Sequence, residues 1–382
     1  MNLGIDATNI RAGGGITHLA ELLSAFNFKD SPIKKIYVFS GHETLKMLPS
    51  SEFIEKVSHK KLNKGLISRS LWQLFSLSKA AKKRKCDILF IPGGNYWGWF
   101  HPVVTLSQNM LPFELEELKR YGLSKMLLKL LLLRIFQSIS FMRSDGVIFL
   151  TDFARVKISK IIGKNVNQSE IVPHGINPCF YNLPKPQKSI DSYNAFNRFK
   201  LTYVSTVDVY KHQLVLITAV SDLIKEGLPL SLEIVGSGYK PELTKMINLM
   251  NKLDPGSIWL KYRGKVPFYQ LPKLYKEADM GVFSSTCENL PNILLEKMAS
   301  GLPIACSNYG AMSEVLGSSG VYFSPTSLEE TKNILRKMIS SPEMRNKSAH
   351  QNYKIAKKYS WNECATKTFN FISFVKNNYV QR

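Results

Sequence analysis

Short apolar segments alternate with helical patterns along most of this chain. Residues 2–7, 35–40, 86–92, 103–106 and 146–150 have the apolar composition of buried strands, whereas 71–85 has helical spacing. A second series of apolar segments follows at 201–206, 232–236, 259–261, 280–284 and 304–307. This alternation predicts parallel sheets with helices on both faces. With 382 residues, the chain is long enough for two such domains.

The boundary between the two series is expected in a segment rich in Pro and polar residues. Residues 178–199 contain Pro184, Pro186 and a polar run, which is typical of a linker. We therefore expect a first domain over 1–180, a linker over 181–200 and a second domain over 201–360. We expect a final helix over residues 361–382. Ligands of such sheets bind at the carboxyl ends of strands, which predicts a cleft between the two domains.

Charge and cysteine content restrict the class of protein. The formal net charge is +22, of which residues 1–190 carry +14. This favours anionic partners, such as nucleic acid, acidic lipid or phosphorylated ligands, without choosing among them. The five cysteines are scattered and contain no CxxC pair, which argues against a disulfide framework or a zinc site. The sequence starts directly on a strand-like segment, so we expect no secretory signal and a cytoplasmic location.

The stretch from Cys287 to Glu296 places two acids around a predicted helix start. Glu288 precedes the helix, Pro291 suits the first helical position, and Glu296 lies more than one turn inside. A helix N-terminus attracts phosphate, and a carboxylate accepts hydrogen bonds from both hydroxyls of a diol. The pattern therefore suits a sugar phosphate. An exposed cap and a solvated helix acid are the alternative.

Residues 280–303 resemble the donor-site signature of retaining family 4 glycosyltransferases, the glycosyl transferases group 1. The resemblance includes the strand at 280–286, the acid pair, Pro291-Asn292 and the helix ending in Gly301-Leu302-Pro303. It implies an α/β GT-B fold, in which two Rossmann-like doubly wound domains face a central cleft. The C-terminal helix is expected to cross back onto the N-terminal, acceptor-binding domain. An ordinary final helix of the second domain is the alternative.

The same resemblance assigns roles to the donor-site residues. Glu288 would contact the donor sugar, and Glu296 would contact the nucleotide ribose. Pro291, Asn292 and Ile293 would start the helix beside the donor.

Residues 201–212 resemble the start of the family's second domain. Lys211 matches a lysine that holds the donor diphosphate and, with Glu288, is predicted to be catalytic. In the family an arginine accompanies this lysine. Its position corresponds to the neighbourhood of Thr206 in this chain, so the second cation is missing there. Arg263 and His212 are the alternatives for the second charge.

Glycines occur where the family's backbone approaches the donor. Gly14 and Gly15 open the first helix and are expected near the diphosphate, with a plain flexible loop as the alternative. Gly236 and Gly238 follow a strand and are expected beneath the nucleotide base, near the segment that contains Arg263.

Two further segments match the family in position. Gln108 and Asn109 replace a His-Asp pair and are predicted to hydrogen-bond the donor sugar or the acceptor, because neutral amides cannot act as a general base. His174 and Asn177 are expected to shape the interdomain hinge.

Residues 125–141 are apolar but contain Lys125, Lys129 and Arg134, which is too charged for a membrane span. We expect a core-facing helix, with an interfacial helix on an anionic membrane as the alternative.

Together these residues predict a retaining hexosyltransferase without cofactor or metal. The donor would be a nucleotide diphosphate sugar, and the acceptor a glycan or lipid-linked glycan of bacterial lipopolysaccharide, O-antigen or capsule. Peripheral contact with an anionic membrane is expected, and nucleic acid is not a predicted partner. The alternatives are a sugar-nucleotide epimerase on the same fold and a basic nucleic-acid-binding protein.

Overall fold

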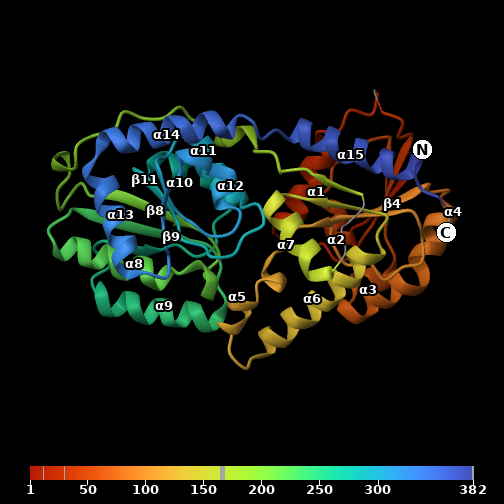
Figure 1. The fold of residues 1–382 in the computed structure, drawn as a ribbon, viewed down its shortest axis with the longest axis horizontal. Coiled ribbons are helices and arrows are strands. Elements are labelled where there is room, and N and C mark those ends of the chain that lie inside the picture. The colour runs from red at the N-terminus through yellow and green to blue at the C-terminus, as the bar shows by residue number, and fades with distance from the viewer. Residues whose placement is uncertain (12, 30, 164–167, 381–382) are drawn as a thin grey trace. The chain divides into compact units, whose positions relative to one another are not determined.

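A computed structural model describes residues 1–11, 13–29, 31–163 and 168–380. These residues divide into two compact units (Figure 1). The first unit contains Met1–Phe113, Leu123–Gly175 and Tyr359–Arg382, and the second contains Glu114–Gly122 and Ile176–Lys358. Each unit is built around its own parallel sheet.

The sheet of the first unit has the strand order β3-β2-β1-β4-β5-β6-β7, and every pair is parallel. Its strands are β1 (Asn2–Asp6), β2 (Lys35–Phe39), β3 (Ile54–Val57), β4 (Ile88–Ile91), β5 (Val103–Ser107), β6 (Gly146–Phe149) and β7 (Ser169–Ile171). The strand order reverses between β1 and β4. Central strands such as β4, β5 and β6 are buried throughout, which explains their continuous apolar sequence.

Helices connect these strands, as right-handed parallel crossovers require. They are α1 (Gly14–Ser24), α2 (His42–Lys46), α3 (Leu66–Trp72), α4 (Ser78–Lys83), α6 (Lys125–Arg143) and α7 (Asp152–Ile162), and α15 (Trp361–Asn377) joins them from the end of the chain. A π-helical segment, η2 (Gln73–Leu77), makes α3 and α4 continuous. The helical pattern predicted over 71–85 therefore begins five residues earlier, at Leu66.

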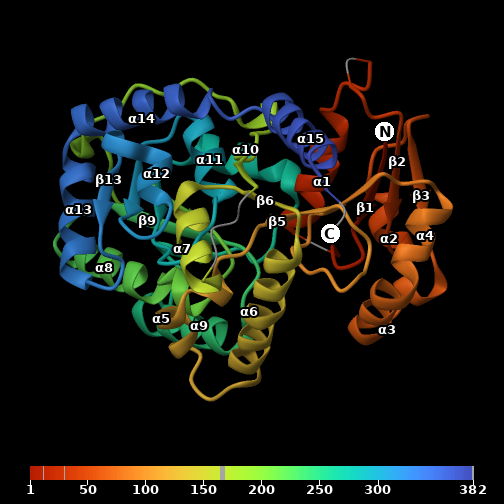
Figure 2. The ribbon, with the colours of Figure 1, turned by 45° about the vertical axis from the view of Figure 1, so that its right-hand side comes forward.

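The C-terminal helix belongs to the first unit, which confirms the predicted crossing back. α15 packs on α1 and lies over β4 and β6 (Figure 2). A side chain at Gly175 would meet the backbone nitrogen of Trp361 at 2.2 Å, and one at Gly146 would meet Val375 at 2.6 Å. Only glycine allows so close an approach at these two positions.

A buried pair of histidines lies beneath α15. Nδ1 of His18, on α1, is 2.8 Å from Nδ1 of His174, and both rings contact Trp361. Burial lowers the pKa of His174 to about 4 and lowers that of His18 as well, so both rings are neutral at neutral pH. His174, predicted at a hinge, thus contributes to the core of the first unit.

The sheet of the second unit has the order β10-β9-β8-β11-β12-β13, again parallel throughout. Its strands are β8 (Phe199–Val204), β9 (Leu230–Val235), β10 (Leu260–Tyr262), β11 (Met280–Phe283), β12 (Ile304–Ser307) and β13 (Val321–Phe323). The order reverses between β8 and β11. Its helices are α5 (Leu115–Lys119), α8 (Gln213–Lys225), α9 (Lys240–Leu253), α10 (Leu271–Glu277), α11 (Asn292–Ala299), α12 (Met312–Leu316), α13 (Leu328–Ser340) and α14 (Pro342–Ala356). Within this unit, α8, α9 and α13 cover one face of the sheet, and α10, α11 and α14 cover the other (Figure 1).

The two-sheet α/β architecture agrees with the sequence prediction, but three short strands were missed. These are β3, β7 and β13, each of three or four residues with partly exposed positions. The predicted linker over 181–200 lies against the second unit, because Tyr181 donates to the Ala356 carbonyl at 3.0 Å and the Asn182 N–H donates to Ala299 at 3.0 Å. Residues 114–122, predicted in the first domain, also belong to the second unit.

The helix α6 differs from the predicted core-facing helix. Only Leu130, Gln137, Ser140 and Phe141 are buried, and its exposed apolar residues are Leu128, Leu131, Leu132, Ile135 and Met142. A run of six apolar residues in seven positions covers the whole circumference of a helix, so half of them must face outward.

Candidate functional site

The candidate site lies at the carboxyl edge of the second unit's sheet. Open parallel sheets bind ligands where the strand order reverses, which here is between β8 and β11. The loops that follow these two strands contain Lys211 and Glu288. The fold therefore brings together two residues that are 77 positions apart in the sequence.

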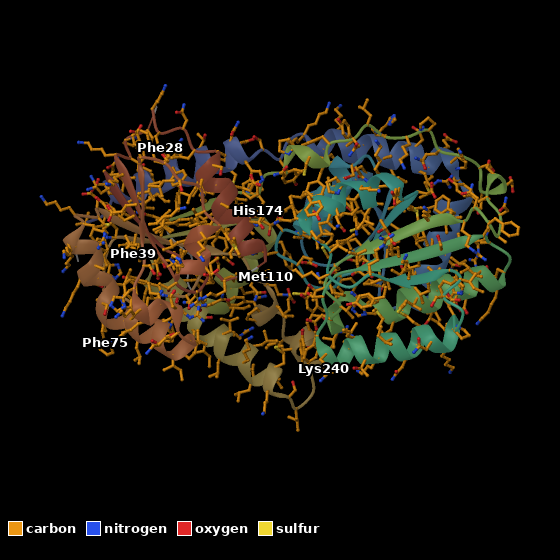
Figure 3. All side chains as sticks on the ribbon, turned by 180° about the vertical axis from the view of Figure 1, so that it is seen from behind. Phe28, Phe39, Phe75, Met110, His174 and Lys240 are labelled. Atoms are coloured by element: carbon orange, nitrogen blue, oxygen red, sulfur yellow. The ribbon has the colours of Figure 1, made fainter. Side chains whose placement is uncertain are left out.

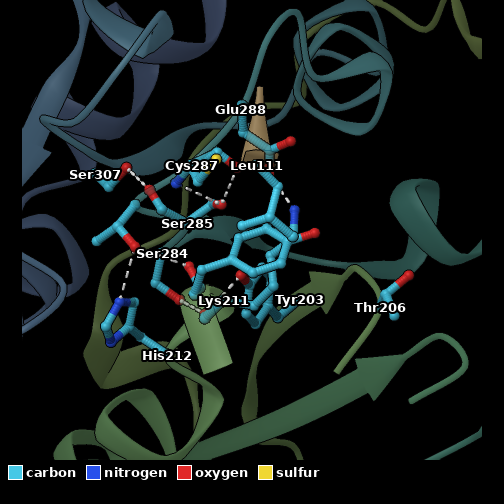
Figure 4. Close-up of polar contacts among 12 residues, drawn as sticks. Leu111, Tyr203, Thr206, Lys211, His212, Ser284, Ser285, Cys287, Glu288 and Ser307 are labelled. Carbon is cyan, nitrogen blue, oxygen red and sulfur yellow. Dashed lines mark hydrogen bonds and ion pairs between the residues drawn. The ribbon is translucent and has the colours of Figure 1, made fainter. Parts of the chain in front are cut away.

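Lys211 and Glu288 form a direct ion pair between Nζ and Oε1 (Figure 4). Lys211 is only 6% exposed, and its ammonium lies over the rings of Tyr210 and Phe283 at 4.8 and 5.6 Å. Aromatic faces stabilise a cation that has lost water. The pair therefore places a largely desolvated positive charge beside a carboxylate, at the edge where a ligand is expected.

The backbone of Lys211 is fixed from the sheet. Its carbonyl accepts hydrogen bonds from the Tyr203 hydroxyl at 2.8 Å and the Ser284 hydroxyl at 2.9 Å (Figure 4). Tyr203 lies on β8 and Ser284 directly follows β11. Both strands that flank the reversal thus position the same residue.

The loop before α11 is held equally closely. The Ser285 hydroxyl donates to the Cys287 carbonyl at 3.1 Å, and the Thr286 N–H donates to the Tyr210 carbonyl at 2.9 Å. Hydroxyl side chains satisfy the backbone groups of this turn, so Glu288 is presented by a rigid segment.

The helix α11 begins one residue later than predicted. Pro291 is the N-cap, in an extended conformation, and Asn292 is the first helical residue. As expected of an N-cap residue, Pro291 has a carbonyl that accepts the first hydrogen bonds of the helix. The donors are the N–H groups of Leu294 and Leu295, at 2.9 and 3.2 Å. Oδ1 of Asn292 is buried without a hydrogen-bond partner, which leaves an acceptor available beside the helix start. Ile293, also predicted here, is half-buried in the first turn.

Glu296 lies within α11, where burial raises its pKa from 4.5 to about 8. Its Oε2 accepts from the Tyr275 hydroxyl at 3.3 Å. The carboxyl is therefore held in place while the free protein keeps it largely protonated near neutral pH. A diol that donates to this group would favour its ionised form.

The neighbouring Lys297 was missed by the sequence prediction. It is fully buried, donates to the Val282 carbonyl at 2.7 Å, and lies over Tyr203 and Phe283. Burial lowers its pKa to about 7. A signal existed in the sequence, since helical periodicity places Lys297 on the same face as Leu294 and Met298.

The structure restricts the choice of a second cation. Thr206 is exposed, as expected for a position that lacks the family's arginine (Figure 4). Burial lowers the pKa of His212 to about 4, so this ring is neutral at neutral pH in the ligand-free protein. Arg263 forms an ion pair with Glu233.

Arg120 is a further cation that the sequence prediction missed. Its positive charge contributes to the lowered pKa of His212. Its segment is anchored on the second unit, because Tyr121 donates to Asp208 at 2.8 Å and stacks edge-on against Tyr239. No spacing rule links residue 120 to residue 211, so only the tertiary fold reveals this relation.

The glycine turn after β9 has the close backbone approach expected of it. Gly236 has φ +146°, and a Cβ there would lie 2.0 Å from the Ser205 carbonyl oxygen. Its N–H donates to Gly264 at 2.8 Å, and its carbonyl accepts from the Tyr262 hydroxyl at 2.8 Å. Gly238 is similarly close, at 2.9 Å, to Leu243. These glycines bring the ends of β8, β9 and β10 together at one edge.

We expect Gly236→Ala to lower the free energy of unfolding by about 3 kcal/mol, because the Ser205 backbone must move to admit a Cβ. Gly264→Ala is the matched control. It also has positive φ, +65°, but no atom lies within 4 Å of its added Cβ. Gly264→Ala should lower the free energy of unfolding by about 1 kcal/mol, because only the left-handed backbone conformation disfavours alanine there. Urea denaturation measures both, and equal costs would contradict the packing argument.

The first unit brings together the other predicted residues. α1 starts at Gly14, and a Cβ on Gly15 would lie 3.5 Å from Oε1 of Gln108, at the carboxyl end of β5. Nε2 of Gln108 is buried without a partner, whereas Oδ1 of Asn109 accepts from the Leu111 N–H at 3.1 Å. Gln108 thus remains able to bind a hydroxyl, while Asn109 has a structural role in a turn.

Metal-binding clusters and membrane-spanning helices are both absent from the described residues. No group of three or more His, Cys, Asp or Glu side chains there could hold a metal ion. Within the same residues, every helix is too short or too polar to cross a lipid bilayer.

The chain has two units, each built on a parallel sheet, and a C-terminal helix that returns to the first unit. These features define the GT-B fold class. Solved structures share this fold over almost the full chain. Anabaena HepE in complex with UDP has a TM-score of 0.71 at 14% identity and covers 98% of this chain and 99% of its own. WaaG, a glycosyltransferase involved in lipopolysaccharide biosynthesis, has a TM-score of 0.68 at 14% identity, with 98% and 100% covered.

The second unit contains the match to a known family. Residues 198–341 match the model of the family Glycosyl transferases group 1. The second unit is therefore similar to the glycosyl transferases group 1 domains, in a chain with the GT-B fold. The O-antigen chain mannosyltransferase B of Escherichia coli is 24% identical over 233 residues, which are 59% of this chain and 59% of that protein. The match thus spans about three fifths of this curated relative.

Proposed function

We propose that the chain is a retaining glycosyltransferase that moves a hexose from a nucleotide diphosphate sugar to a glycan acceptor. The observation that carries the proposal is the pairing of Lys211 with Glu288 at the strand reversal, together with a half-buried Glu296 on α11. This arrangement offers a cation for a diphosphate, a carboxylate for sugar hydroxyls and a second carboxylate for a ribose diol.

Each group has a role in the proposed reaction. Lys211 and the N–H groups at the start of α11 would stabilise the leaving diphosphate, so no metal is required. Glu288 would orient the sugar, and Glu296 would bind the ribose. The acceptor hydroxyl would attack from the face that the diphosphate leaves, and the diphosphate would take its proton. The protein contributes positioning and charge.

The relatives support a donor and an acceptor of this kind. HepE has been solved with UDP and with UDP-glucose. The curated relatives include the O-antigen chain mannosyltransferase, a sulfoquinovosyl transferase of Arabidopsis thaliana and protein CapJ of Staphylococcus aureus. We propose that the acceptor is a growing bacterial surface glycan, free or lipid-linked.

Thermal shift with UDP, GDP, ADP and dTDP and their sugars tests the donor site. One nucleotide should raise the melting temperature of the wild type, and Glu296→Ala should lose most of that ligand-induced shift. Transfer of labelled sugar from the stabilising donor to an oligosaccharide then tests the reaction, and the anomeric configuration of the product tests retention. No shift with any nucleotide would contradict the proposal.

We further propose that Arg120 supplies the second diphosphate charge. Arg120→Met should weaken nucleoside diphosphate binding about tenfold, or about 1.4 kcal/mol, with a smaller effect on the nucleoside. Arg263→Met is a matched comparison, because both arginines are paired with a glutamate and are 38% exposed. A tenfold loss in Arg263→Met alone would instead assign the charge to Arg263, one of the two alternatives that the sequence left open.

A further inference from the structure

The continuous helix from α3 through η2 to α4 has an unusual outer face. Its inner face is buried through Trp72, Leu77 and Ala81. Its outer face exposes large apolar side chains, with Leu66 at 62%, Ile67 at 78%, Leu71 at 48% and Phe75 at 65% exposed. We name these four residues the α3 patch. Phe75 lies at the outer edge of the first unit (Figure 3).

Three of the four residues form one strip, and Leu66 precedes it at the start of the helix. Ile67, Leu71 and Phe75 are spaced four apart, so they project from one side of the helix. Trp99 extends the strip, since it is 69% exposed and its backbone N–H donates to Ser78 at 3.2 Å. Arg143 lies over the Trp99 ring at 5.0 Å. A contiguous apolar strip of this kind marks an interaction surface.

Positive charge surrounds the α3 patch. Between Glu55 and Asp87 the sequence contains ten Lys or Arg residues and no Asp or Glu. The exposed lysines flank the patch on both sides and are Lys60, Lys61, Lys64, Lys79, Lys82, Lys83 and Lys85. Among the ion pairs of the described residues, none gives one of these seven an acidic partner.

We propose that the α3 patch docks the first unit onto an anionic lipid bilayer. Apolar side chains would enter the boundary between headgroups and acyl chains, with Trp99 at the interface and the lysines against acidic headgroups. The positive charge around the α3 patch favours an anionic bilayer over other partners. A second copy would bring two strongly positive surfaces together, and nucleic acid would leave the apolar centre without a partner. The inference is independent of the proposed reaction.

Vesicle sedimentation tests the surface with the full chain. The wild type should bind vesicles of phosphatidylcholine with 30% phosphatidylglycerol, and bind neutral vesicles at least tenfold more weakly. Leu66→Ser/Ile67→Ser/Phe75→Ser should reduce binding to the anionic vesicles at least tenfold, or about 1.4 kcal/mol. Lys79→Glu/Lys82→Glu/Lys83→Glu should do the same through charge.

The second unit provides a matched control. Leu183, Ile258 and Phe196 are 76%, 68% and 101% exposed, so Leu183→Ser/Ile258→Ser/Phe196→Ser removes the same residue types from another surface. This control should bind like the wild type. Equal losses in both serine variants, equal binding to neutral vesicles, or binding to duplex DNA in place of vesicles would overturn the proposal.

Two further measurements test how deeply Trp99 enters the bilayer and whether the serine variant is folded. Brominated acyl chains should quench part of the tryptophan fluorescence, and Trp99→Phe should remove that part. The serine variant should keep the wild-type melting temperature and nucleotide-induced thermal shift, because its substituted side chains are exposed and lie outside the second unit. Failure of vesicle binding with an intact nucleotide response would thus overturn the docking surface alone.

Discussion

Lys211→Met is expected to lower turnover by about 10²- to 10³-fold. Methionine keeps much of the side-chain volume over Tyr210 and Phe283 but removes the charge that faces the leaving diphosphate. The magnitude is that of removing one preorganised electrostatic contact from an active site. Steady-state transfer assays at saturating donor measure it, and near-normal turnover would contradict the role.

The ion pair allows a sharper version of this experiment. Lys211→Met leaves Glu288 without its cation, which should also destabilise the fold, by about 3 kcal/mol for a buried pair. Lys211→Met/Glu288→Gln should recover most of that stability but none of the turnover. Glu288→Ala should lower turnover at least tenfold, about 1.4 kcal/mol. If turnover followed stability through the series, the pair would be structural.

Glu296→Gln is expected to gain stability and lose function. Burial raises the pKa of Glu296 to about 8 in the folded protein, against 4.5 when exposed. Between these values the folded protein holds a proton that the unfolded chain has released, so stability falls as pH rises through the window. Glutamine lacks this cost. The variant should therefore be more stable at pH 8.5, by about 1–3 kcal/mol, and nearly equal to the wild type near pH 4.

Nucleotide binding should change in the opposite direction. The neutral amide replaces a carboxylate that can accept from both ribose hydroxyls, so we expect at least tenfold weaker binding, about 1.4 kcal/mol. Wild-type affinity should also rise from pH 6 to pH 8.5 as Glu296 ionises, whereas the variant should not show that rise. Calorimetry at several pH values measures this, with exposed Glu343→Gln as the control. A variant that loses stability and keeps affinity would contradict the role of Glu296.

Local chemistry explains which parts of this fold the sequence could predict. Long apolar strands and helices with clear periodicity, such as β4 and α15, were predicted close to their observed bounds. The donor segment was predicted because strand, acid and helix start are contiguous. Pro291 was misplaced by one residue because proline suits both the N-cap and the first helical position.

The remaining errors arise from tertiary structure. The short strands β3 and β13 have few buried residues, so their pattern is weak. The exposed leucines of α6 cannot be distinguished from buried ones in a sequence that is apolar on all sides. Arg120 lies near His212 only because Tyr121 anchors its segment through Asp208. The pKa of His212 likewise depends on burial that no local pattern reports.

The packing of α15 also bears on how the protein is made. Residues 361–377 complete the core of the first unit, over α1, β4 and β6. On the ribosome, these residues follow the entire second unit. The first unit therefore lacks α15 until the second unit has been synthesised. During that time, α1 and the His18–His174 pair remain uncovered. Chaperones that engage nascent chains would meet this unfinished surface for most of translation, and shortening the chain before Trp361 would make that state permanent.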